Sequence, residues 1–174
     1  TSEEAEKEVT DILNEYRDIM ENYLAIPVVV GVKTDSEKFA GALYTTTLEA
    51  IMPDGKALQM GTSHNLGQNF GKVFDIKFVG EDKQDHYVWQ TSWGITTRLI
   101  GAIVMVHGDD KGLVLPPKVA PVQAVIVPIP YKGSDPAAVA EKAREIYAAL
   151  VEKGLSAVLD DREEYTPGWK FNQW

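Results

Sequence analysis

The start of the chain repeats apolar residues with the period of an α-helix. Apolar side chains recur at spacings of three and four over residues 2–23, which predicts an amphipathic helix. Thr1 and Glu4 have the spacing of a capping box at its start. Pro27 is expected to end this helix, and the apolar run over 26–32 predicts a short buried strand.

The next seventy residues have the pattern of antiparallel strands. We expect strands at four places: 39–52, 56–61, 75–78 and 87–92. Asp54 and Gly55 lie between the first two as a hairpin signal. Residues 65–70 are expected to form a short helix or turn, and the apolar stretch 96–107 predicts a buried helix.

Prolines between residues 116 and 121 indicate a connector, after which the pattern changes. The continuous apolar run 122–129 is typical of a strand buried on both faces. Pro136 predicts the first turn of a helix, and 156–159 predicts a second short strand that completes a βαβ unit. The sequence therefore predicts an antiparallel α+β domain at 1–120 and a truncated α/β domain at 121–174.

Composition excludes several classes of protein. With 44% apolar residues the chain is expected to fold. It has no cysteine, so disulfides, thiolate zinc sites and a cysteine nucleophile are excluded. No apolar run approaches the ~20 residues that span a bilayer, and the acidic start is unlike a signal peptide. We expect a cytoplasmic protein.

The net charge of −9 is unusual for a protein that binds nucleic acid. The first 24 residues hold eight acidic and two basic residues, a net charge of −6, and the remainder is close to neutral. Net charge therefore neither supports nor excludes an RNA partner.

Polar side chains gather in one short stretch of the first domain: Gln59, Thr62, Ser63, His64, Asn65, Gln68 and Asn69. So much hydrogen-bonding capacity beside a predicted strand end favours a binding site. The alternative is a loop in which Thr and Ser cap the next turn. His64 could contact a ligand, transfer protons or satisfy a backbone group.

Arg98 lies in the first turn of the predicted helix 96–107. A cation there is unfavourable with the helix dipole unless an anion is close. A phosphate would satisfy both the free amides and the guanidinium. The alternative is that Arg98 pairs with an internal carboxylate.

Other candidate chemistry is weaker. The three histidines lack metal-ligand spacing, and Gly-rich phosphate loops are absent. Asp109 and Asp110 are expected in a solvated turn after the helix. The aromatic residues of 165–174 predict either core packing or base stacking, and core packing is favoured.

Longer motifs resemble a known family. They are residues 61–70 (GTSHNLGQNF), 90–101 (QTSWGITTRLIG), 105–109 (MVHGD) and 112–117 (GLVLPP). In order and spacing they resemble the prolyl-tRNA synthetases of the archaeal and eukaryotic type. Residues 165–174 (YTPGWKFNQW) resemble part of that family's anticodon-binding domain.

The resemblance implies a class II aminoacyl-tRNA synthetase, a proline–tRNA ligase. Such an enzyme joins L-proline to ATP, releases pyrophosphate and transfers the prolyl group to tRNA(Pro). Residues 1–120 would form the later half of its antiparallel catalytic sheet with helices, and 121–174 the start of its α/β anticodon-binding domain. ATP and Mg²⁺ are the implied cofactors, zinc is implied only in a C-terminal domain beyond Trp174, and the implied assembly is a homodimer with no membrane contact.

The resemblance also implies roles for individual residues. Arg98 would be the catalytic residue against the nucleotide. The remaining ATP contacts would come from Gln59, Thr62 and Thr96, and Gln59 would also lie near Mg²⁺. The proline pocket would include His64, Trp93 and Gly94.

Motifs 1 and 2 of the family are missing from the sequence. The resemblance thus implies a fragment, and we expect the isolated fragment to be inactive. The alternative function is a non-catalytic synthetase-like paralogue with a binding or regulatory role. Paralogues of that kind usually lose the ATP-facing residues, which are present here.

Overall fold

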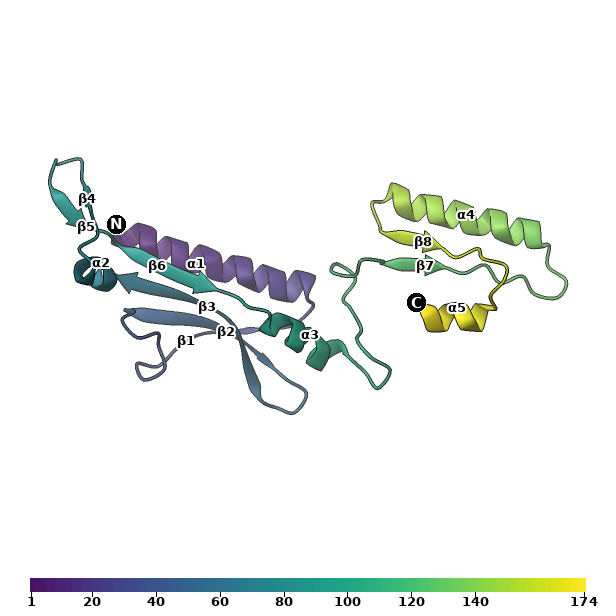
Figure 1. Cartoon of the computed structure of the whole chain (residues 1–174), viewed down its shortest axis with the longest axis horizontal. Helices are drawn as coiled ribbons and strands as arrows, with labels where there is room; N and C mark the ends of the chain where they lie inside the picture. The colour runs from purple at the N-terminus through teal and green to yellow at the C-terminus, as the bar shows by residue number, and fades with distance from the viewer. The chain divides into compact units, whose positions relative to one another are not determined.

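The computed structural model describes all residues, Thr1–Trp174. The chain divides into two compact units, Thr1–Pro116 and Pro117–Trp174, which are described separately (Figure 1). The division lies within the proline-rich connector.

The predicted N-terminal helix is confirmed, with its last turn widened. Helix α1 (Ser2–Asp18) continues into a π-helical turn, η1 (Ile19–Tyr23). The capping box is present: the Thr1 hydroxyl accepts a hydrogen bond from the Glu4 amide at 3.2 Å, and the Glu4 carboxylate bonds back to Thr1. Leu24 N–H donates to the Ile19 carbonyl at 2.9 Å, which is the i to i−5 bond of a π-turn.

Four antiparallel strands form the sheet of the first unit. They are β1 (Val29–Val32), β2 (Tyr44–Ile51), β3 (Ala57–Gly67) and β6 (Gln90–Gly94), in the order β1-β2-β3-β6. The predicted hairpin between β2 and β3 is confirmed. Gly55 takes a φ of 81° there, a left-handed conformation that favours glycine.

Helix α1 packs across one face of this sheet, against β2, β3 and β6 (Figure 1). The core between them is apolar, as the spacing of apolar residues along α1 predicts. Its fully buried members include Val9, Met20, Ile26 and Leu48. Gly61 lets the helix approach β3 closely, because a Cβ there would lie 3.3 Å from Met20 Cε and 2.9 Å from Ile95 Cγ2.

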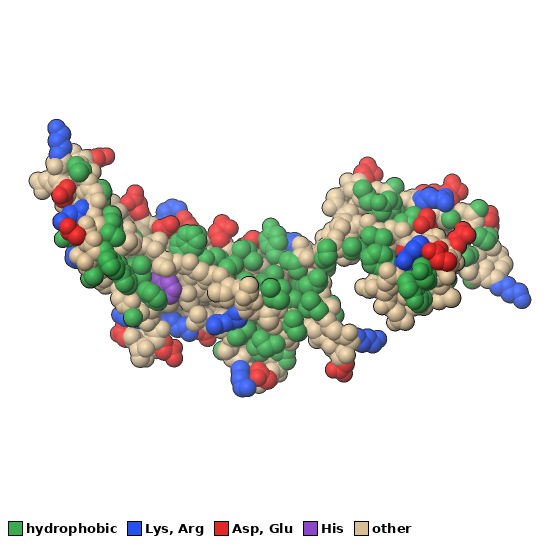
Figure 2. Space-filling model, viewed as in Figure 1, with side chains coloured by type: hydrophobic (Ala, Val, Ile, Leu, Met, Phe, Trp, Pro, Cys, Tyr) green, Lys and Arg blue, Asp and Glu red, His purple; other side chains and the backbone are tan.

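Two burials expected in the first unit are wrong. Strand β1 is an edge strand, and Val29 and Val32 are more than 60% exposed, so it is not a buried strand. Helix α3 (Arg98–His107) buries only Leu99, Ala102 and Ile103. Ile100, Val104 and Met105 of this helix are exposed. They contribute to the hydrophobic surface that Figure 2 shows in green around α3.

Several element bounds also differ from expectation. Strand β3 runs on to Gly67, so the polar stretch is mostly strand rather than loop, and the short helix α2 is Asn69–Val73. A separate hairpin of β4 (Lys77–Val79) and β5 (Asp85–Tyr87) precedes β6. Tertiary pairing decides these bounds, because hydrogen bonds to β2 and β6 continue β3 past the point where its local pattern becomes polar.

The second unit contains the predicted βαβ motif. Strands β7 (Ala124–Ile126) and β8 (Ala157–Leu159) pair in parallel, with helix α4 (Pro136–Glu152) between them. The Asp135 carboxylate caps α4 by accepting from the Ala137 amide at 2.9 Å. Strand β7 is only half-buried, so the burial on both faces expected for the run 122–129 is wrong.

Helix α5 (Pro167–Gln173) is joined to the end of β8 by the buried Asp160. The Asp160 carboxylate accepts from Arg162 at 2.6 and 2.8 Å and from Trp174 Nε1 at 2.9 Å. The Arg162 guanidinium holds the pKa of this carboxyl well below its usual range. Buried Lys170 donates to the Asp160 carbonyl at 2.9 Å.

The aromatic residues near the end of the chain are not core. Tyr165 and Trp169 stack with ring centroids 3.8 Å apart, and Arg162 lies against both rings. Their side chains, with those of Phe171 and Trp174, remain 37–60% exposed. The favoured expectation of core packing is therefore wrong.

None of the helices combines the length and the apolar composition that a membrane-spanning helix requires.

Candidate active site

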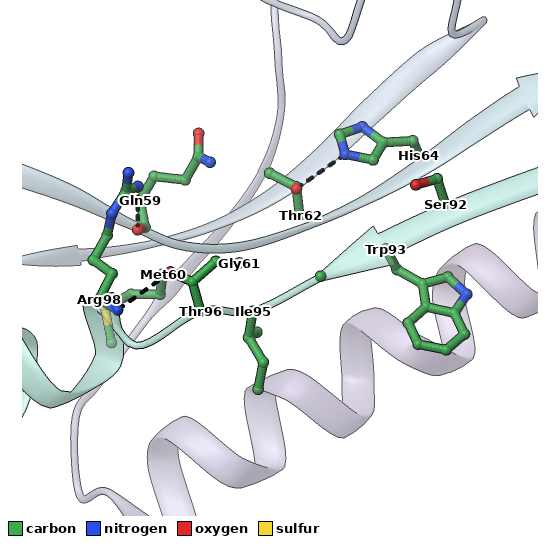
Figure 3. Close-up of a pocket in the computed structure, with 11 residues that line it drawn as sticks. Gln59, Met60, Gly61, Thr62, His64, Ser92, Trp93, Ile95, Thr96 and Arg98 are labelled. Atoms are coloured by element: carbon green, nitrogen blue, oxygen red, sulfur yellow. Dashed lines mark hydrogen bonds between the residues drawn. The ribbon is translucent and has the colours of Figure 1, made fainter.

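One pocket of about 280 Å³ lies on the first unit, where β3, β6 and the turn into α3 meet. All seven residues to which the family resemblance gives a role line it. The complete lining is Gln59, Met60, Gly61, Thr62, His64, Ser92, Trp93, Gly94, Ile95, Thr96 and Arg98 (Figure 3). Segments about thirty residues apart in sequence are brought together because β3 and β6 are hydrogen-bonded neighbours.

Alternation along β3 places Thr62 and His64 on the pocket side and Ser63 on the buried side, toward α1. By simple alternation Gln59 would lie on the buried side as well. A β-bulge prevents this: Leu48 pairs with Gly61 and Glu49 with Gln59, so Met60 is the extra residue. The bulge turns the Gln59 side chain to the side of Thr62 and His64 (Figure 3).

The resemblance implies that Trp93 is part of the proline pocket, but its indole does not face His64. Ser92 pairs with His64 and Trp93 pairs with Ser63 across β3 and β6. The Trp93 indole therefore points to the α1 side, away from His64, and is 47% exposed (Figure 3). A Cβ added at Gly94 would have no other atom within 4 Å, so the space beside the strand is unfilled there.

Two threonine hydroxyls hold the His64 imidazole. Nδ1 lies 2.8 Å from Thr45 Oγ1, and Nε2 lies 3.0 Å from Thr62 Oγ1. Burial lowers the pKa of the imidazole, so His64 is neutral at pH 7. A neutral ring has one donor and one acceptor nitrogen, which matches a partner on each side.

Phe39 and Thr45 lie beside His64 and were missed by the sequence analysis. The Phe39 ring centroid lies 5.1 Å from that of His64, and the Phe70 ring lies behind it, 6.3 Å from Phe39. Thr45 is 2% exposed and also accepts the Phe39 amide at 2.9 Å. The only sequence signal was the Thr45-Thr46-Thr47 run, which indicates a strand but not the contact with His64.

Arg98 reaches over the pocket without an ionic partner. One guanidinium nitrogen donates to the Gln59 carbonyl at 3.1 Å, and the Arg98 amide donates to the Thr96 hydroxyl at 3.2 Å. Arg98 forms no ion pair, and no Asp or Glu lines the pocket. The alternative of an internal carboxylate partner is therefore wrong. A guanidinium with unused donors in a site without carboxylates favours an anionic ligand.

Three other side chains of the polar stretch have structural roles. Asn65 Oδ1 accepts from the Gly67 amide at 2.9 Å, Gln68 donates to the Tyr87 carbonyl at 2.8 Å, and Asn69 donates to the Gly41 carbonyl at 2.8 Å. Asp109 and Asp110 lie in an exposed turn, as predicted. No cluster of three or more His, Asp or Glu residues that could hold a metal ion is present.

A second cavity of about 580 Å³ lies in the second unit, among the segment after β7, the first half of α4 and the segment after β8. Its lining includes three cations, Arg144, Arg162 and Lys170, and three carboxylates, Asp161, Glu163 and Glu164. It is at the carboxyl ends of two parallel strands, where open α/β sheets usually bind ligands.

Comparison with known proteins agrees with this architecture. Residues 1–107 match the tRNA synthetase class II core domain (G, H, P, S and T), and residues 123–174 match an anticodon binding domain. The chain is 60% identical to a proline–tRNA ligase of Cenarchaeum symbiosum over 99% of its own length, and 57% identical to one of Natranaerobius thermophilus over 100%. It spans 36% of the length of each of these relatives.

A solved structure covers the whole chain as well. The crystal structure of prolyl-tRNA synthetase from Cryptosporidium parvum, complexed with L-proline and AMP, superimposes with a TM-score of 0.87 at 49% identity. The match covers 100% of this chain and 38% of that one. These matches confirm the predicted antiparallel synthetase sheet followed by an anticodon-binding domain, and the chain belongs to the class II tRNA synthetase core domain family.

Proposed function

We propose that residues 1–174 supply part of the active site of a proline–tRNA ligase. One observation supports this most strongly: a single pocket gathers Gln59, Thr62, His64, Thr96 and Arg98 around an unpaired cation. The relatives at 54–60% identity are named proline–tRNA ligases, and the solved relative binds L-proline and AMP. We therefore assign this pocket to ATP and the adjoining His64 region to proline.

The first reaction would be adenylation of proline. A carboxylate oxygen of proline attacks the α-phosphorus of ATP, the bond from that phosphorus to the bridging oxygen breaks, and pyrophosphate leaves. Negative charge shifts onto the phosphoryl oxygens, and a cation already in place stabilises it without reorganisation. Arg98 has unused guanidinium donors for this task, with Thr62 and Thr96 hydroxyls in the same pocket.

The proline side of the site would be formed around His64. Proline offers a small apolar ring, an ammonium and a carboxylate. The tilted Phe39 ring provides an apolar surface beside the neutral imidazole, and Gly94 leaves the neighbouring strand open. We do not assign the Trp93 indole to proline, since it points to the other side of β6.

Mg²⁺ would be held mainly by the nucleotide. Mg²⁺ prefers oxygen ligands and is usually bound by a few carboxylates together with phosphates. Gln59 offers one amide oxygen on the pocket side, and no carboxylate lines the pocket. Gln59 fits a supplementary ligand to a phosphate-bound ion, which would neutralise charge on the pyrophosphate.

The second unit would bind tRNA(Pro). It matches an anticodon binding domain. Its cavity includes Arg144, beside three carboxylates and two cations that already bond Asp160, and exposed stacked aromatic rings lie next to it. Cations suit phosphates, and exposed rings suit bases. A homodimer in the cytoplasm, with no membrane partner, completes the proposal.

Proline-dependent exchange of pyrophosphate into ATP tests the function. It should be measured on the full-length protein that contains this chain, with proline and with glycine, histidine, serine and threonine as competing substrates. Exchange that depends on proline alone supports the proposal. A well-folded protein without exchange for any of them would instead be the non-catalytic paralogue.

His64→Ala should raise the Michaelis constant for proline and leave that for ATP nearly unchanged. Both ring nitrogens already bond threonine hydroxyls, so the imidazole offers proline its ring surface. Loss of that contact surface is expected to cost about 2- to 10-fold. His86→Ala is the matched control, because His86 lies on the β4–β5 hairpin and pairs with Asp82. If His64→Ala raised the ATP constant and not the proline constant, His64 would be assigned to the wrong ligand.

A further inference from the structure

Two threonine hydroxyls and one imidazole form a hydrogen-bonded chain from the interior of the first unit to the pocket. Thr45 on β2 lies outside the pocket lining and is 2% exposed. Its hydroxyl contacts His64 Nδ1, and His64 Nε2 contacts Thr62, which does line the pocket. The direction of these hydrogen bonds decides which atom at the pocket end is free to donate.

The Phe39 amide fixes that direction. An amide N–H can only donate, so Thr45 Oγ1 accepts from Phe39 at 2.9 Å. The Thr45 hydroxyl hydrogen then needs an acceptor, and His64 Nδ1 at 2.8 Å is the only other hydrogen-bonding neighbour of this oxygen. If Nδ1 instead carried a hydrogen, the buried Thr45 hydroxyl would be left without an acceptor, which is costly.

We propose that Thr45 is a positioning residue that holds His64 as its Nε2–H tautomer and thereby leaves the Thr62 hydroxyl hydrogen free to donate to an oxygen of the bound ligand. In that tautomer Nε2–H donates to Thr62 Oγ1 at 3.0 Å. The Thr62 hydroxyl has no other hydrogen-bond partner within the protein. Its hydroxyl hydrogen is therefore directed at the ligand, a phosphate oxygen if the pocket binds ATP.

The tautomer can be measured without any enzymatic activity. The chain contains three histidines, so ¹⁵N-histidine labelling and comparison with His64→Gln assign the His64 ring signals. We expect Nδ1 to give the signal of an unprotonated ring nitrogen and Nε2 that of a protonated one. The opposite assignment in the unsubstituted chain would overturn the proposal, whatever the variants do.

Variants test the role of Thr45. Thr45→Val, which keeps the shape but removes the hydroxyl, should convert the single tautomer into a mixture, and Thr45→Ser should restore the Nε2–H form. Thr46→Val is the matched control, because the Thr46 hydroxyl bonds the Ser63 carbonyl at 2.8 Å and does not touch the ring. An unchanged tautomer in folded Thr45→Val would also contradict the proposal.

The consequence for the ligand rests on the proposed function. In the full-length protein, Thr45→Val should raise the Michaelis constant for ATP by roughly 2- to 10-fold, the worth of one hydrogen bond, and Thr45→Ser should restore it. A shifted tautomer with an unchanged ATP constant would overturn the link through Thr62. Absence of exchange in the unsubstituted protein would contradict the proposed function, while the ring signals would still decide the tautomer.

Discussion

Arg98→Ala should reduce the rate of proline-dependent pyrophosphate exchange by on the order of 100-fold or more in the full-length protein. The reason is electrostatic. Arg98 is the one cation that lines the pocket, it has no ionic partner, and no carboxylate lies beside it. A fixed guanidinium stabilises charge that develops on the phosphates, and water that replaces it must reorient during the reaction.

The fold should survive this substitution, because Arg98 is exposed and makes one side-chain hydrogen bond, to the Gln59 carbonyl. Arg17→Ala is a suitable control, since Arg17 pairs with Glu21 on α1 and lies outside the pocket. Arg98→Lys separates charge from shape, because lysine keeps the charge but loses the planar fork of donors. Near-normal exchange in Arg98→Ala would contradict the assignment of Arg98 to ATP.

Leu48→Ala should lower the free energy of unfolding of the first unit by about 3 kcal/mol, within the 2–5 kcal/mol typical of buried leucines. Leu48 is 0% exposed and pairs with Gly61 in the sheet that α1 covers. Truncation leaves a cavity that the neighbouring strands cannot close, because β2 is hydrogen-bonded on both sides. Urea unfolding followed by circular dichroism measures the change.

Ile51→Ala is the matched control for Leu48. Ile51 lies on the same strand but is 61% exposed, so its truncation should change the free energy of unfolding by less than about 0.5 kcal/mol. Equal losses for Leu48→Ala and Ile51→Ala would show that the core is not where this structure has it.

Local pattern was sufficient where each element depends on its own residues. The helix over 2–23 was predictable because its apolar side chains share one face and Thr1 caps it. The βαβ unit was predictable because Asp135 and Pro136 begin a helix between two short apolar strands. Burial was less predictable: the edge position of β1 and the exposed apolar side of α3 depend on which elements lie next to them.

The sequence by itself determined the residue types of the candidate site and, through the long motifs, the family. Only the tertiary structure decided how those residues face one another. The bulge at Met60 turns Gln59 to the pocket side, and strand pairing turns the Trp93 indole away from it. Thr45 on β2 contacts His64 on the neighbouring strand β3. These outcomes depend on the register between strands far apart in sequence, and a shift of one residue would exchange the two faces.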